Sequence, residues 1–169
     1  EDNGQILRLR ESNYFLSGKA LVDFVNPSND EVRAFELKNM EEVIKNYDVD
    51  GVVLDRTRYD NETADFSPLT RGKFEAFLAT KGKQLTNWPA DVFTYVNNVR
   101  KPGPLINDWW EFRSQTIKTF TDDVRALTDR YTALKGHKVN ASAYVGSWFE
   151  SYYLNGVHWG SPNFNYDSR

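Results

Sequence analysis

The sequence of 169 residues contains no cysteine and only 2 histidines. The absence of cysteine excludes a thiol nucleophile, a disulfide framework and a thiolate metal site, although it leaves the cellular compartment open. His137 and His158 are far apart along the chain, and a lone histidine in a loop is usually a polar surface group. A glycine-rich phosphate loop is also missing, because Gly146 and Gly156 have no glycine partners at the required spacing. We therefore expect neither a metal nor a cofactor.

Long hydrophobic runs and a strong charge of one sign are missing as well. The longest apolar runs are only a few residues, so we expect no contact with a membrane. The net charge is -3, with acidic and basic residues interleaved, which gives no basic stripe for nucleic acid. The length suffices for one domain with a core, and no repeat or domain boundary divides residues 1–169.

Aromatic residues are abundant and make up 15% of the chain. Many of them stand in turn-rich segments, as in the Trp109–Trp110 pair and in residues 148–153. Core filling explains most of the phenylalanines. Aromatic residues in polar loops more often line a ligand surface, and sugar rings are natural partners for their flat faces.

Hydrophobic patterning predicts strands that alternate with helices. The expected order is strand, helix, strand, three helices and a last strand, over residues 20–25, 30–47, 49–54, 72–80, 90–99, 109–134 and 139–145. Such an order favours an α/β fold built from parallel βαβ units with right-handed crossovers. The run Val49–Leu54 is rich in β-branched residues and does not alternate, which predicts a strand buried on both faces.

Polar residues follow this strand abruptly, beginning with Asp55, Arg56 and Arg58. Ligands bind at the carboxyl ends of parallel strands, so these side chains are expected to border a cleft. A carboxylate in this position must be solvated by the cleft or paired with a cation, because its burial alone is costly. A functional carboxylate and a structural ion pair with Arg33, Arg56 or Arg58 are equally compatible with the residues.

Three predicted strand ends together gather a set of polar and aromatic side chains. The set consists of Asn26, Asp55, Arg56, Arg58, Tyr59, Trp148 and Glu150. Glu150 is of interest because adjacent strands could place it opposite Asp55, and paired carboxylates are what cleavage of a glycosidic bond requires.

Two segments at a fixed separation resemble the glycoside-hydrolase-like family 10 proteins, which are relatives of the α-amylase-type barrels. They are Phe24–Arg33, with the sequence FVNPSNDEVR, and Tyr47–Tyr59, with the sequence YDVDGVVLDRTRY. The resemblance extends more loosely to residues 110–113 and to the strand from Val139. The chain departs from the family pattern at three positions, where the usual His, Asp and Pro are replaced by Val53, Arg56 and Asp60.

The resemblance implies a (β/α)8 TIM barrel that hydrolyses O-glycosidic bonds of a polysaccharide or oligosaccharide. Asp55 matches the catalytic carboxylate that ends strand four, and Glu150 is the implied acid/base. If Asp55 is the nucleophile, the mechanism is retaining and the two carboxyl groups lie about 5–5.5 Å apart. The implied substrate-binding residues are Asn26, Arg56, Arg58, Tyr59, Trp109, Trp110 and Trp148.

A complete barrel takes about 250 residues, so this chain provides only part of one. We therefore expect a partial catalytic domain that is completed by the remainder of a larger barrel or by a homo-oligomer that covers its sheet edges. The chain begins at Glu1 rather than methionine, which indicates a processed or trimmed product from which any signal peptide would already be gone. A periplasmic, cell-surface or secreted location with a carbohydrate substrate fits these expectations.

Two other interpretations remain open. The first is a carbohydrate-binding or structural α/β module without catalysis, which is favoured by the partial length and by Arg56 in place of a second acid. The second is a small, self-contained, doubly wound domain, which predicts that residues 1–169 fold as a stable monomer.

Overall fold

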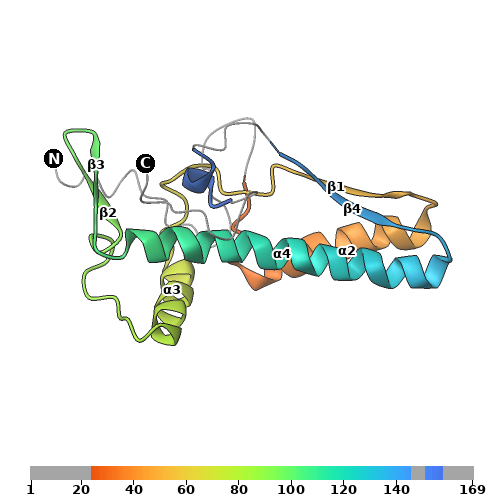
Figure 1. Cartoon of the computed structure of the whole chain (residues 1–169), viewed down its shortest axis with the longest axis horizontal. Coiled ribbons are helices and arrows are strands. Elements are labelled where there is room, and N and C mark those ends of the chain that lie inside the picture. The colour runs from red at the N-terminus through yellow and green to blue at the C-terminus, as the bar shows by residue number, and fades with distance from the viewer. Residues whose placement is uncertain (1–23, 146–150, 158–169) are drawn as a thin grey trace.

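The computed structural model describes residues 24–145 and 151–157. Its elements follow in the order α2 (Asp30–Asn46), β1 (Gly51–Asp55), α3 (Pro68–Thr80), β2 (Phe93–Val96), β3 (Val99–Pro102), α4 (Ile106–Lys135), β4 (Asn140–Tyr144) and the short 3-10 helix η1 (Tyr152–Asn155). Helix α4 runs along the molecule, with β1, β4 and α2 beside its carboxyl-terminal half (Figure 1). The β2–β3 hairpin and α3 lie by its amino-terminal half (Figure 1). No described helix is long and apolar enough to cross a membrane.

Strands β1 and β4 form a two-stranded parallel sheet, in register from Gly51 opposite Asn140 to Asp55 opposite Tyr144. The prediction of an α/β fold with parallel pairing is thus confirmed at this coarse level. The (β/α)8 barrel is not: among the described residues the parallel sheet has two strands, and the other sheet is an antiparallel hairpin.

One face of the parallel sheet carries the core of this half of the molecule. Leu54 and its neighbour Val52 point towards α2 and α4, where they meet Met40, Phe120 and Val124. The opposite face is open, and Val53 is 67% exposed there. The expectation that this strand is buried on both faces is therefore wrong, because both packing helices lie on the same side of it.

The hairpin replaces the short helix that was expected over residues 90–99. Asn97 and Asn98 both adopt left-handed backbone angles, with φ of 49° and 65°. Two such residues in a row form the tight turn that matches the twist of an antiparallel pair, and asparagine tolerates this conformation better than most residues. The segment therefore folds back on itself and pairs Phe93 with Pro102.

Helix ends follow the local chemistry of their sequence. The Asn29 side chain accepts hydrogen bonds from the backbone amides of Glu31 and Val32 at 2.8 and 3.3 Å, which caps α2. Helix α4 ends at Gly136, whose φ of 71° gives the left-handed cap. It begins at Ile106, three residues earlier than the expected residue 109, so that Asp108 lies inside its first turn.

The expected strand over residues 20–25 lies largely outside the described residues.

The aromatic core is formed where α3, the hairpin and the start of α4 meet. Trp109 is at its centre, with ring centroids 4.9 Å from Phe66 and 5.0 Å from Phe74. Burial of large aromatic side chains is a main source of stability in a domain of this size.

Candidate functional site

The carboxyl end of β1, where the sequence places its main candidate, is an exposed sheet edge. Asp55 is the last residue of the strand and lies opposite Tyr144. Its side chain makes no ion pair or hydrogen bond with any residue that the structure describes. Two of the three arginines offered as partners are engaged elsewhere: Arg33 pairs with Asp123 at 2.7 Å, and Arg58 donates to backbone carbonyls.

A groove of about 440 Å³ runs beside β1. Its walls come from the start of α2, the end of β1 with the following loop, and the middle of α4. Three of the predicted site residues, Asp55, Arg56 and Arg58, line it, together with apolar side chains such as Met40 and Phe120. The groove thus combines a mostly aliphatic and aromatic wall with a polar rim.

Asn26 and Tyr59, two predicted substrate-binding residues, are instead fully buried. The Asn26 side-chain amide donates to Asp65 and to the Thr70 hydroxyl, the latter at 3.3 Å. The Tyr59 hydroxyl lies 3.0 Å from the Ser28 hydroxyl. Both side chains therefore hold loops together inside the molecule and offer no surface to a ligand.

Asp65 is the centre of this interior and was not identified from the sequence. Its carboxylate accepts hydrogen bonds from the side chains of Asn26, Ser67 and Thr70 and from the Ser67 amide. Burial raises the pKa of Asp65, and these hydrogen bonds act against that rise. We call these four residues the Asp65 cluster. The Asn26–Pro27 and Ser67–Pro68 steps are turn signals, but nothing local in the sequence indicates that they meet.

Arg113 is a second buried group that sequence reasoning passed over. Its guanidinium donates to three backbone carbonyls, those of Leu154 at 3.1 Å, Asn61 at 2.7 Å and Ala64 at 2.5 Å. It also lies over the Tyr59 ring, 4.2 Å from the centroid. Burial lowers the pKa of Arg113 to about 10, so the group stays charged at neutral pH. The signal was its spacing of three from Trp110, which places both on one face of α4.

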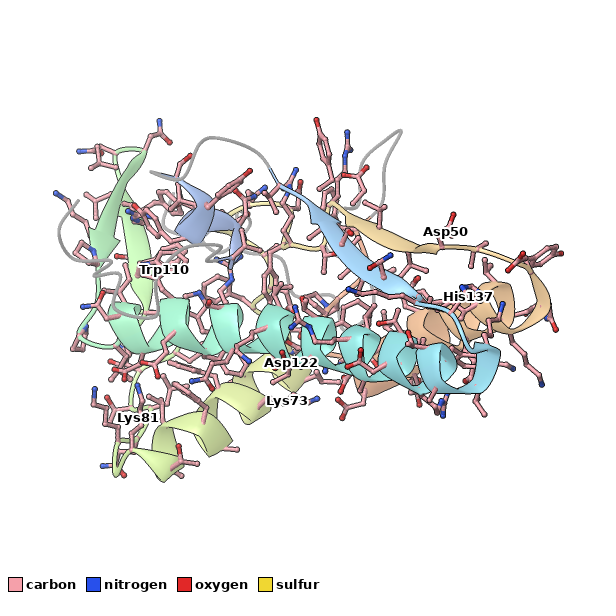
Figure 2. All side chains as sticks on the ribbon, turned by 45° about the vertical axis from the view of Figure 1, so that its right-hand side comes forward. Asp50, Lys73, Lys81, Trp110, Asp122 and His137 are labelled. Carbon is pink, nitrogen blue, oxygen red and sulfur yellow. The ribbon has the colours of Figure 1, made fainter. Side chains whose placement is uncertain are left out.

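Glu62 joins the hairpin to the loop after β1. Its carboxylate accepts a hydrogen bond from the Tyr95 hydroxyl at 2.6 Å and pairs with Arg100. The Arg100 guanidinium in turn lies 5.6 Å from the Trp110 ring centroid and 3.4 Å from the Tyr153 hydroxyl. Trp110 lies near the start of α4, close to the hairpin (Figure 2). This polar cluster links three separate elements.

The tryptophans that the resemblance implied as sugar platforms are core residues where the structure describes them. Trp109 is 0% and Trp110 is 3% exposed. A platform needs one open ring face, and neither ring has one. Trp148 and Glu150 lie outside the described residues.

A comparison with curated proteins found an S-layer-related protein of Niallia circulans that is 71% identical over 168 residues. The match covers 99% of this chain but 10% of that relative, so the chain spans about a tenth of the length of the protein it matches. No family model matches the chain. No solved structure matches it either.

These findings correct the interpretation that rested on the resemblance. The relative bears the name of an S-layer-related protein and not of a hydrolase. Neither the family models nor the solved structures connect the chain with a barrel. Membership of the glycoside-hydrolase-like family 10 is therefore wrong, and so is the expectation of a glycosidase that uses carboxylate catalysis. The alternative, a module without catalysis, agrees better with the similarity that was found.

Proposed function

We propose that this chain is a non-catalytic structural segment of a long cell-surface or secreted polypeptide. The observation that carries the proposal is the match to the S-layer-related protein, at 71% identity across 99% of this chain and 10% of the relative. Such identity over almost the whole chain favours the same fold and the same setting inside a much longer polypeptide. The role of the segment is then to contribute a folded unit to a surface assembly.

The positions and contacts of the charged groups support a structural role. Asp65 and Arg113 each tie a loop to a helix in the interior, and the half-buried Glu62 ties a loop to the β2–β3 hairpin. Catalytic sites instead bring groups of shifted pKa into a cleft. Of the described groups whose pKa is shifted, none lines the groove beside β1.

Carbohydrate binding, the other half of the non-catalytic alternative, has less support. Flat aromatic faces are the usual sugar contacts, and the described tryptophans Trp109 and Trp110 are buried. Asp55, Arg56 and Arg58 are polar enough to contact a ligand, but their groove has a largely apolar wall. We therefore place the structural role first.

The proposal is tested by locating the native polypeptide and by comparing a variant that removes buried contacts with one that changes an exposed side chain. Antibodies against residues 1–169 should label intact cells and detect a polypeptide much longer than 169 residues. In that polypeptide, Arg113→Met should weaken surface assembly because it unpairs three buried carbonyls. Arg130→Met, on the same helix, should leave assembly unchanged, because the Arg130 side chain is 55% exposed.

The opposite pattern would contradict the proposal. If Asp55→Asn abolished a measured activity or glycan binding while circular dichroism showed an intact fold, the carboxylate would have a chemical role. A native polypeptide found only inside the cell would exclude the surface setting.

A further inference from the structure

The open face of the β1–β4 sheet carries side chains that suit a buried contact. The parallel register places Gly51 beside Asn140, Val53 beside Ser142 and Asp55 beside Tyr144. These six residues alternate with those that pack against α2 and α4, and we call them the outer face. At the free edge of β1, Val53 and Asp55 also border the groove. Val53 is 67% and Tyr144 is 73% exposed. A β-branched and an aromatic residue therefore lie uncovered at the centre and the end of this face.

Sheet geometry makes this exposure unusual. Parallel strands occur almost always in sheets that are covered on both faces, and isolated two-stranded sheets are marginal in water. Here α2 and α4 cover one face, through contacts with Val52, Leu54, Ala141 and Ala143. Within the described ranges, β1 pairs only with β4, so each strand also keeps an open edge. An uncovered sheet of this kind invites a further contact.

The length of the relative leaves ample chain outside the matched region from which a covering segment can come. The match occupies 10% of the S-layer-related protein, so nine tenths of a comparable polypeptide lies outside the region compared here. We propose that the outer face is the docking surface for another segment of the same long polypeptide, outside residues 1–169. This inference rests on the proposed function, because it requires that the chain is part of such a polypeptide.

The side chains of the outer face indicate what the covering segment must offer. The centre of that segment should be an apolar strand or helix face that covers Val53 and Tyr144. Beside these it should place a cation or a hydrogen-bond donor within reach of Asp55, whose carboxylate has no described partner. A segment of the same chain also has an advantage over a second molecule, since tethering gives it an effective concentration in the millimolar range.

Thiol labelling tests this inference directly, because the chain has no cysteine of its own. Val53→Cys and Tyr144→Cys each place a single thiol on the outer face of the native long polypeptide. Lys118→Cys is the control, since its side chain is 70% exposed on α4. We expect a maleimide to label the two outer-face thiols at least ten times more slowly in native buffer than in urea. The control thiol should react at similar rates in both.

Three results would overturn the inference. Equal labelling of the outer-face and control thiols in the native long polypeptide would leave the face open. Protection that disappears on dilution would assign the face to a second copy. Protection already present in residues 1–169 alone would assign it to this chain. The proposed function fails separately, if the native polypeptide is no longer than this chain or is absent from the surface, whatever the thiols report.

Discussion

Arg113 lies fully buried on α4, and its guanidinium connects the loop after β1 to η1 through backbone carbonyls. A buried charge is tolerated when several hydrogen bonds replace its hydration, and the planar fork of arginine can serve several acceptors at once. The Tyr59 and Trp110 rings lie 4.2 and 5.3 Å from its centre and add cation–π contacts. At this scale one side chain therefore determines how two irregular segments meet.

Replacement of Arg113 by methionine should be strongly destabilising. The change keeps an apolar stem but leaves the carbonyls of Asn61, Ala64 and Leu154 without these donors. Unpaired buried polar groups of this kind cost about 3 kcal/mol in the free energy of unfolding. Urea denaturation followed by tryptophan fluorescence measures the loss as a lower midpoint.

Arg130→Met is the matched control, since Arg130 lies on the same helix with its side chain 55% exposed and pairs with Glu41. Exposed pairs contribute about 0–1 kcal/mol, so this variant should remain close to the wild type. Equal losses in the two variants would show that the buried carbonyls do not depend on Arg113.

The β2–β3 hairpin shows how single positions decide the form of an element. Its turn relies on the left-handed Asn97 and Asn98, and its exit relies on Gly103. The Gly103 amide donates to the Val92 carbonyl at 2.8 Å. A side chain at Gly103 would meet the carbonyl oxygens of Ala90 and Asp91 at 2.2 and 2.3 Å. Only glycine, which has no Cβ atom, therefore fits at position 103.

Gly103→Ala should accordingly destabilise the protein, because backbone atoms must move to admit the methyl group. Overpacking of this type costs about 1–3 kcal/mol. Gly72→Ala should have the opposite sign: Gly72 lies inside α3 with nothing within 4 Å of an added Cβ, and alanine favours a helix by about 0.5–1 kcal/mol. Thermal unfolding of both variants checks the pair, and the explanation fails if Gly103→Ala unfolds at or above the wild-type temperature.

The stability of the whole molecule reflects two buried aspartates that respond to pH in opposite ways. Burial raises the pKa of Asp65. For Asp108, burial also acts to raise the pKa, but hydrogen bonds from Lys83 and Lys81 outweigh it and lower the pKa. Lys83 lies 2.8 Å and Lys81 3.2 Å from this carboxylate. Lys81 marks the end of α3 in Figure 2.

The signs follow from proton binding. The folded protein binds the Asp65 proton more tightly than the unfolded chain, so this group adds stability as the pH falls and loses it as the pH rises through the folded pKa. Asp108 binds its proton more weakly when folded, so its stabilisation is lost as the pH falls. Between pH 7 and about pH 4, near the unfolded value, wild type should gain stability relative to Asp65→Asn. Below about pH 4 it should lose stability relative to Asp108→Asn. Urea midpoints at several pH values test both trends, and parallel curves for all three proteins would refute them.

The sequence allowed a good prediction of the elements that have regular patterns. The apolar stripe of α2 and the β-branched run of β1 are local features, so they could be recognised without the structure. The hairpin was missed because four-residue strands are too short to distinguish alternation from a helical turn. The burial of Val53 was predicted wrongly. Its exposure depends on which elements cover the sheet, and no local sequence pattern reports that.

The candidate site was harder to predict because its polar residues meet across long stretches of the chain. Asn26 and Asp65 are 39 residues apart, and Arg113 and Asn61 are 52 residues apart. Trp109 and Trp110 were assigned to a ligand surface because they follow a turn-rich segment, but a helix of 30 residues carries both into the core. Asp55 was placed correctly at the end of β1, whereas its role followed from a resemblance that was wrong.

The parallel register of β1 and β4 also determines how this segment would carry a mechanical load. When two parallel strands are pulled from opposite ends, all of their interstrand bonds are strained together in shear. The antiparallel β2–β3 hairpin, pulled at its open end, releases its bonds one pair at a time. Helix α4, about 45 Å long, joins the two regions. The β1–β4 pair should therefore resist pulling more strongly than the β2–β3 hairpin does.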